Sequence, residues 1–315
     1  MKISRQTREI INIVIFVLVV AALVLTYVVY PLSRTKAIMA RPGVDEFQED
    51  STVVNDPATW VQAGLLVDTM TIETDGLTKV ACLYVWPTGD ASADSTTIPP
   101  SDDSLKGTAI LLHPDGTGRD HMLDLARAFL QEGFSVAVYD QRAAGLSCGY
   151  YRGEGQYESN DLLAVTAYLD LRGKITHPLV VVGFETGGDA ALLAALEEKR
   201  IDLVASVSPY LSTRRMQDVL KERYDTYWFP FYRTIMWFWY NIRSSYAASY
   251  RDLEQIQAVA GPTLVMADTQ AIQSDEYSRL VELSKPDLLS MHQLPTEPAR
   301  LFDEIIEFTK ASATR

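Results

Sequence analysis

The chain has 315 residues, of which 47% are hydrophobic, enough for one large core. Its net charge of −13 at pH 7 argues against binding to nucleic acid and against electrostatic adhesion to anionic lipid. The two cysteines, Cys82 and Cys148, are too few to frame the fold, and the sequence leaves open whether they pair. No zinc, calcium or phosphate-loop motif occurs, so we expect no metal and no cofactor.

An uncharged apolar run, residues 10–30, follows a short tail of residues 1–9. As a helix rising about 1.5 Å per residue, the run would span about 30 Å, the hydrocarbon thickness of a bilayer. Pro31 ends the run, and Tyr27 and Tyr30 lie where interfacial aromatic residues are typical. The sequence therefore predicts a transmembrane anchor, with the lipid bilayer as the partner of residues 10–30.

A cleaved signal peptide is the alternative for this run. The run is too long for a signal peptide, and Arg34 and Lys36 occupy the region where a cleavage site would lie. The basic residues on the two sides are balanced: Lys2, Arg5 and Arg8 precede the run, and Arg34, Lys36 and Arg41 follow it. A short charged tail tends to stay inside, which predicts a single-pass protein with an extracytoplasmic globular part.

A polar stalk, residues 31–61, precedes a single globular domain predicted for residues 62–315. Residues 70–86 alternate between apolar and polar around Asp75-Gly76, which predicts an antiparallel hairpin. Residues 88–107 are rich in Ser, Thr, Asp and Pro and predict a long loop.

Strands and helices then alternate along the chain. An apolar strand at 108–112 ends in a loop that begins with His113. An amphipathic stretch at 122–131, a strand at 133–140 and a helix ending near Leu171 come next. This alternation implies right-handed crossovers and a mostly parallel central sheet flanked by helices.

A sharp turn between the next strand and helix is the most informative feature. The apolar strand 178–182 runs into Gly183-Phe-Glu185-Thr-Gly187, and a helix-forming, Ala- and Leu-rich segment follows. This is the strand–turn–helix pattern of a nucleophile elbow, in which the glycines permit the tight turn. The central residue of that pattern is usually Ser, and here it is Glu185.

Together these segments resemble the α/β-hydrolase superfamily, and within it the lysophospholipase-like serine hydrolases. The positions that match the family pattern are His113, Asp140, Arg142, Gly145, Ser147, Glu158, Asp161, Gly183 and Gly187. The resemblance extends over about residues 62–310 and implies the α/β-hydrolase fold, with further strands near 206–210 and 261–267 and a last helix at 299–310.

The departures from the family pattern all concern catalysis. Glu185 replaces the nucleophile, and Asp268, the candidate acid, comes a few positions earlier than the family's acid. The family's base His precedes the last helix, where this chain has none, so His292 is the only candidate base. Asp268 is alternatively a loop cap, and Glu185 alternatively a solvated or ion-paired carboxylate.

The resemblance also places the oxyanion-hole equivalents at Asp115 and Thr186. The family's His-Gly is His113-Pro114 here, and we expect the Asp115 carboxylate to repel an oxyanion. His113 itself is predicted to have a packing or loop role. Arg142 is predicted to pair with a carboxylate such as Glu158.

An aromatic insertion separates the sixth and seventh strands. Ten aromatic residues lie between Tyr224 and Tyr240, inside a predicted cap at about 212–252. These side chains pack on the core, line a lipophilic channel, or enter the bilayer interface beside the anchor. The residues we assign to such a cap or ligand pocket are Trp228, Phe229, Trp237 and Trp239.

Two functions therefore remain open. In the first, the chain is a membrane-anchored pseudoenzyme with a hydrolase fold that binds a lipophilic small molecule or a protein partner. In the second, it is an active hydrolase of an apolar ester or amide that uses Glu185 or a rearranged site. The lost Ser and the missing positioned His favour the first.

Overall fold

The computed structural model describes most of the chain. The described residues are 5–33, 56–74, 78–87, 104–149, 152–153, 155–212, 215, 231, 234–235, 238–239, 259, 261–285 and 287–313. Contacts divide the chain into two compact units, Met1–Ala40 with Met216–Ser249 and Arg41–Arg215 with Tyr250–Arg315. The predicted stalk and the predicted cap lie largely outside the described residues.

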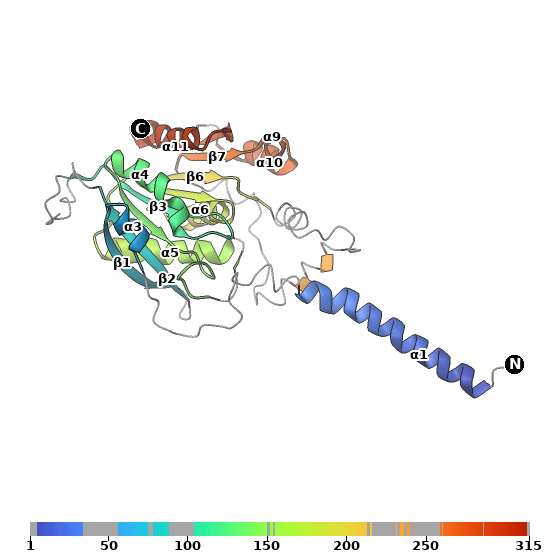
Figure 1. Ribbon diagram of the computed structural model, residues 1–315. Coiled ribbons are helices and arrows are strands. Elements are labelled where there is room, and N and C mark those ends of the chain that lie inside the picture. The colour runs from blue at the N-terminus through green and yellow to red at the C-terminus, as the bar shows by residue number, and fades with distance from the viewer. Residues whose placement is uncertain are drawn as a thin grey trace. The chain divides into compact units, whose positions relative to one another are not determined.

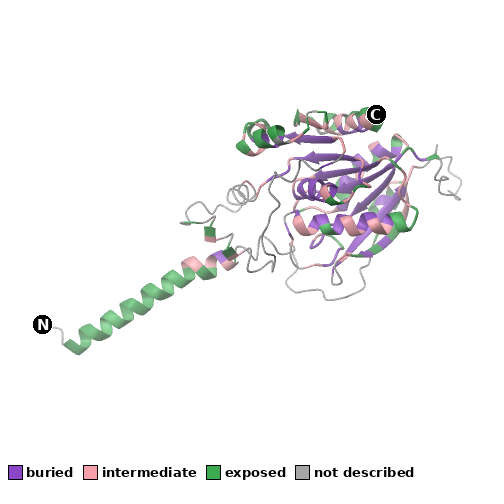
Figure 2. Cartoon of the chain, turned by 180° about the vertical axis from the view of Figure 1, so that it is seen from behind, coloured by how far each residue is buried: buried purple, intermediate pink, exposed green. Residues whose placement is uncertain are grey.

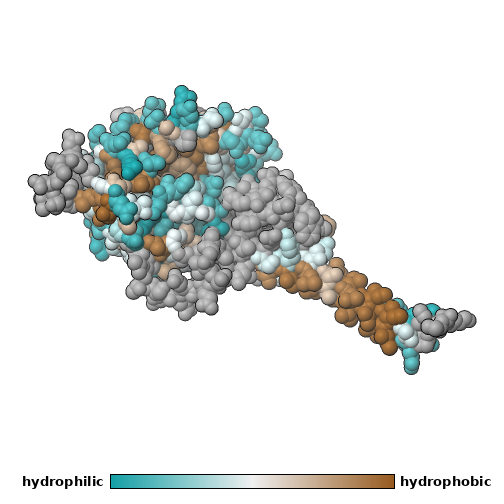
Figure 3. Space-filling view, viewed as in Figure 1, coloured by the Kyte–Doolittle hydropathy of each residue, from teal (hydrophilic) through white to brown (hydrophobic). Residues whose placement is uncertain are grey.

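The first unit contains the N-terminal helix. Helix α1 (Arg5–Val24) continues through a π-helical turn (Leu25–Val29), and the helical segment ends at Ser33. Its apolar side chains are exposed along most of its length, and they form the brown surface of Figure 3. The segment is long and apolar enough to cross a membrane, and it contains the run 10–30.

The second unit is built on an eight-stranded sheet (Figure 1) in the order β1-β2-β4-β3-β5-β6-β7-β8. The strands are β1 (Leu66–Glu73), β2 (Lys79–Trp86), β3 (Thr108–Leu112), β4 (Ser135–Tyr139), β5 (Leu179–Phe184), β6 (Leu203–Val207), β7 (Thr263–Ala267) and β8 (Leu289–Gln293). The predicted hairpin is confirmed, with Glu73 opposite Lys79 and Leu66 opposite Trp86. Strand β2 pairs antiparallel with β4, and all further pairings are parallel.

Helices cover both faces of this sheet. Helices α5 (Gln156–Leu171), α6 (Thr186–Glu197) and α10 (Asp275–Leu283) pack on one face. Helices α3 (Ala58–Gln62), α4 (Leu123–Gln131) and α11 (Pro298–Ala313) pack on the other. The inner parallel strands β3 to β7 are almost wholly buried (Figure 2), as their apolar runs require, whereas the edge strands β1 and β8 are partly exposed.

The structure adds detail to the predicted elements. The last helix is α11, which begins and ends slightly outside the predicted 299–310, and a short helix, α9 (Thr269–Ile272), follows β7. Cys82 and Cys148 are both free and buried, so these two thiols form no disulfide. Because parallel strands all end at one edge of the sheet, the loops after β3, β4, β5 and β7 meet there.

The loop after β4 is organised by Asp140. Its Oδ1 accepts the Arg119 N–H at 2.8 Å and its Oδ2 accepts the Leu146 N–H at 3.0 Å. Gly145 has φ +48°, and a Cβ at this position would overlap the Asp140 carboxylate. The Gly of this motif is therefore required both by its backbone conformation and by the carboxylate beside it.

We expect Gly145→Ala to lower the free energy of unfolding by about 3 kcal/mol, because it adds backbone strain and displaces a buried hydrogen-bonded carboxylate. Gly173→Ala is the matched control, since Gly173 has φ +64° and open space around its Cα. The control should cost only about 1 kcal/mol of backbone strain. Denaturant unfolding of both variants measures the difference, and equal losses would contradict the role assigned to Asp140.

Candidate active site

Glu185 is the single residue between β5 and α6. It has φ 49° and ψ −117°, a strained conformation for a residue with a side chain, and its N–H donates to the Val207 carbonyl at 2.8 Å. Gly187, two residues further, lies so close to β3 that a Cβ would come within 2.8 Å of Leu112 Cβ. The close packing of α6 on β3 therefore holds the turn at the carboxyl edge of the sheet.

The Glu185 carboxylate bonds to the loop after β3. Its Oε2 accepts the backbone N–H of Asp115 at 3.2 Å. This N–H is the donor that the resemblance assigned to the oxyanion hole, and here it is used by the carboxylate. The second assigned donor, Thr186, is the first residue of α6 and is 6% exposed.

The sequence led us to expect that the Asp115 carboxylate would repel an oxyanion, but it did not indicate a cationic partner for this side chain. The carboxylate forms a buried ion pair with Arg152, and the two side chains are 4% and 12% exposed. Its charge is therefore balanced by a guanidinium instead of being directed at an oxyanion, while the backbone of the same residue faces Glu185. No motif indicated Arg152, because its partner lies 37 positions earlier in the chain and is reached only through the fold.

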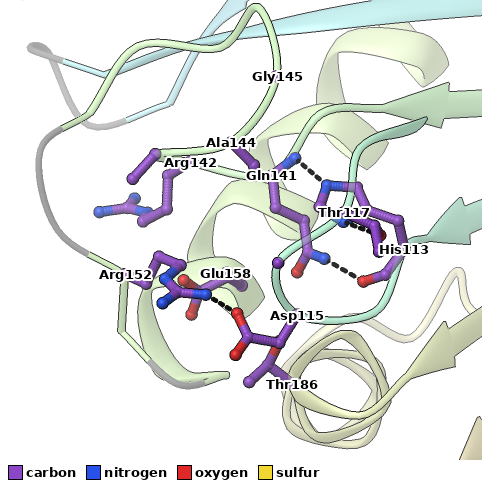
Figure 4. Close-up of a pocket in the computed structure, with 12 residues that line it drawn as sticks. His113, Asp115, Thr117, Gln141, Arg142, Ala144, Gly145, Arg152, Glu158 and Thr186 are labelled. Carbon is purple, nitrogen blue, oxygen red and sulfur yellow. Dashed lines mark hydrogen bonds and ion pairs between the residues drawn. The ribbon is translucent and has the colours of Figure 1, made fainter. Parts of the chain in front are cut away.

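A cavity of about 270 Å³ adjoins this pair (Figure 4). Arg152 and Asp115 point toward one another at its edge, and Thr186 lies beside them. The amide of Gln141 also lines the cavity: its nitrogen donates to the His113 carbonyl, and its buried Oε1 has no hydrogen-bond partner in the described structure. The lining is rich in charged, amide and hydroxyl groups, so the cavity suits water or a small polar group more than an acyl chain.

A second arginine fixes the wall of the cavity. Arg142 donates to both oxygens of Asp161, at 2.7 and 2.6 Å, and stacks over the ring of Tyr157 at 4.8 Å. Burial raises the pKa of Asp161 to about 6 and the pairing with Arg142 opposes this shift, so the carboxylate is ionised at neutral pH. The expected partner Glu158 instead accepts the N–H groups of Gly153 and Gly155, each at 2.8 Å.

His113 is a buried neutral side chain. Its Nε2 accepts the Gln141 N–H at 3.0 Å, and its Nδ1 lies 2.9 Å from the Pro114 carbonyl. An accepting Nε2 requires the proton on Nδ1, so both nitrogens are occupied. Burial lowers the pKa of His113 below its usual 6.5. These contacts fit the loop role predicted from the sequence.

The remaining two candidates, Asp268 and His292, contact groups other than Glu185. Asp268 follows β7 and caps α9, where its Oδ1 accepts the Ala271 N–H at 2.7 Å. His292 lies within β8, is half-exposed, and places its Nδ1 3.1 Å from Glu304 on α11. His292 therefore has a carboxylate partner on α11, at the β8 edge of the sheet.

The other two histidines, His177 and His121, do not lie on the turn at Glu185. His177 contacts Asp202 before β5 begins, at the opposite edge of the sheet, and His121 is exposed on the turn Arg119–Met122. Trp228, Phe229 and Trp237 lie outside the described residues, and Trp239 belongs to the first unit. Among the described residues, no group of three His, Cys, Asp or Glu side chains is arranged to hold a metal ion.

Comparisons with known proteins agree with this architecture. A family model described as serine aminopeptidase, S33, matches residues 103–281, more than half of the chain. The chain belongs to the serine aminopeptidase S33 family. It is therefore a member of the α/β-hydrolase superfamily, as the resemblance predicted. None of the curated proteins matches this sequence.

Solved structures with the same fold include esterases. The Pyrococcus furiosus esterase Pf2001 is 18% identical with a TM-score of 0.62, over 86% of this chain and 100% of that one. The α/β hydrolase GrgF from Penicillium sp. sh18 is 16% identical with a TM-score of 0.56, over 80% and 100%. Est1E from Butyrivibrio proteoclasticus with ferulic acid bound is 15% identical with a TM-score of 0.57, over 78% and 100%. At these identities the likeness establishes the fold alone.

The buried state of His113 in this S33 family member predicts its titration. Its imidazole should titrate with a pKa below the usual 6.5, with the proton of the neutral form on Nδ1, because protonation of Nε2 would disrupt the bond from the Gln141 N–H. Since the folded pKa is lowered, the contribution of His113 to stability is lost as the pH falls below 6.5. Nitrogen NMR shifts, assigned by their loss in His113→Gln, measure this; a titration midpoint at or above 6.5 would contradict it.

The Asp115–Arg152 pair makes a second prediction. Asp115→Asn should lower the free energy of unfolding by about 3 kcal/mol, because it removes the charge that faces a buried guanidinium. The double variant Asp115→Asn with Arg152→Gln should recover part of this loss in a thermodynamic cycle. Glu132→Gln, which breaks the exposed pair with Lys310, is the control and should cost less than about 1 kcal/mol. If the double variant lost the sum of the free energies lost by Asp115→Asn alone and Arg152→Gln alone, the pairing would be contradicted.

Proposed function

We propose that the chain is a membrane-anchored hydrolase-fold protein that lacks serine-hydrolase activity and acts by binding a lipophilic ligand or a protein partner. The observation that carries this proposal is the bond from the Asp115 N–H to the Glu185 carboxylate. The turn at Glu185 is, in this proposal, the counterpart of the family's nucleophile elbow.

Acyl transfer needs a nucleophile, a base to activate it and donors for the oxyanion. At the turn the nucleophilic hydroxyl is replaced by a carboxylate, and one donor is already used by that carboxylate. A substrate carbonyl would have to displace Glu185 and then accept negative charge beside it, which both sterics and charge oppose. All four histidines lie in the described part of the chain, and His113, His177 and His292 contact groups other than Glu185.

The proposed binding role is supported by the family features that the folded domain still contains. The strained turn, the Asp140 loop and the Arg142–Asp161 pair are all present in the folded domain. The cavity beside Asp115 is polar, so we assign a lipophilic ligand to the aromatic insertion instead. The apolar helix α1 supports location at a membrane, with the globular domain outside the cytoplasm.

An active hydrolase that uses Glu185 is the second candidate. The strained φ of Glu185 favours it, because such strain is concentrated at functional positions. A carboxylate nucleophile would form an ester with the substrate, and a base would then have to activate water to release it. The described structure supplies no histidine for that step at the turn.

We expect no labelling of the full chain by a fluorophosphonate probe, and no hydrolysis of p-nitrophenyl esters above background. Glu185→Ser should remain inactive, because a serine without a base is a weak nucleophile at neutral pH. The measurements are gel fluorescence and release of p-nitrophenol.

The controls separate this proposal from the alternative. Glu185→Gln keeps the size of the side chain and removes its charge. Glu197→Gln makes the same change at an exposed position, the last residue of α6. Esterase activity of the unsubstituted chain that Glu185→Gln abolishes and Glu197→Gln preserves would overturn the proposal. It would establish Glu185 as the nucleophile or base.

A further inference from the structure

The insertion after β6 is tied to the end of the apolar helix within the first unit. Tyr27 lies in the π-helical turn Leu25–Val29, near the end of the helical segment. The indole Nε1–H of Trp239 donates to the Tyr27 carbonyl, at 3.4 Å. Trp239 therefore lies at the C-terminal end of the apolar segment.

Exposed phenylalanines lie on the same unit. The side chain of Phe231 is 78% exposed and that of Phe238 is 55% exposed, while the Phe238 ring packs edge-to-face on Trp239 at 5.2 Å. Among the described residues, the only other exposed phenylalanine is Phe16, on the apolar helix itself. In the second unit the exposed large apolar residues are scattered aliphatic ones, such as Leu171 on α5.

Charge is distributed unequally between the two units. Residues 31–40 and 216–249 together carry six Lys and Arg against three Asp and Glu. The second unit, Arg41–Arg215 with Tyr250–Arg315, carries 19 against 37. The total charge argued against adhesion to anionic lipid, but the segments at the end of the helix are basic. An anionic lipid surface would therefore attract these segments and repel the second unit.

We propose that Phe231, Phe238 and Trp239 form a surface that lies in the headgroup region of an anionic bilayer, beside the point where α1 leaves it. Aromatic rings favour this depth, because one side meets acyl chains and the other meets water. The inference rests on the proposed function in one respect, namely that α1 spans a membrane. In this inference, the lipophilic partner of the aromatic insertion is the bilayer.

The test uses the full chain in vesicles of phosphatidylcholine and phosphatidylglycerol. An environment-sensitive fluorophore is attached at Phe231→Cys, Phe238→Cys or, as the matched exposed control, Leu171→Cys. The native thiols are buried and the unsubstituted chain measures their background labelling. Labels at 231 and 238 should shift to the blue, and a lipid with a nitroxide near its headgroup should quench them at least about twofold more than the label at 171.

Alkaline carbonate extraction and flotation separate the two possible failures. A chain that leaves the vesicles would refute the anchor, and with it the proposed location. A chain that stays while labels at 231 and 238 behave like that at 171 would overturn this inference alone. Arg233→Glu should reduce quenching at 238, whereas Lys199→Glu, the same charge change on the second unit, should not. Equal quenching in vesicles of phosphatidylcholine alone would overturn the anionic part of the proposal.

Discussion

The site depends on one hydrogen bond, between the backbone N–H of Asp115 and the carboxylate of Glu185. It joins the loop after β3 to the turn after β5, which are adjacent because these two strands pair directly. The turn positions Glu185 through its strained backbone, and Arg152 forms an ion pair with the Asp115 side chain. The carboxylate thus occupies an N–H donor that a substrate carbonyl would otherwise have to reach.

The loops around this bond are rigid for reasons that do not require catalysis. Asp140 accepts two backbone N–H groups, and Ser147 accepts the N–H of Ala81 while donating to the Asp140 carbonyl. Arg142 and Asp161 form a bidentate buried pair. Each group satisfies a polar partner that would otherwise be buried without a hydrogen bond, so the loop requires these residues whatever chemistry the domain performs.

The two units differ in how much apolar surface they expose and in the sign of their net charge. The second unit buries its apolar strands between two layers of helices and carries a large negative charge. The first unit exposes an apolar helix and carries its net positive charge on flanking segments. A basic, apolar unit and an acidic unit in one chain would respond oppositely to an anionic surface, which would attract the first unit and repel the second.

The sequence by itself determined the fold class, the order of strands and helices, and the turn at Glu185. Local periodicity and glycine spacing carry this information, because strands and sharp turns impose their own patterns on neighbouring residues. It also determined the apolar helix, whose length and composition are visible without any fold. Only the tertiary structure decided that Arg152 pairs with Asp115 and that Asp161, not Glu158, pairs with Arg142. It also placed His292 beside Glu304. These partners are separated by 12 to 37 positions in the chain, so the packing of loops and helices selects them, and no local pattern records that choice.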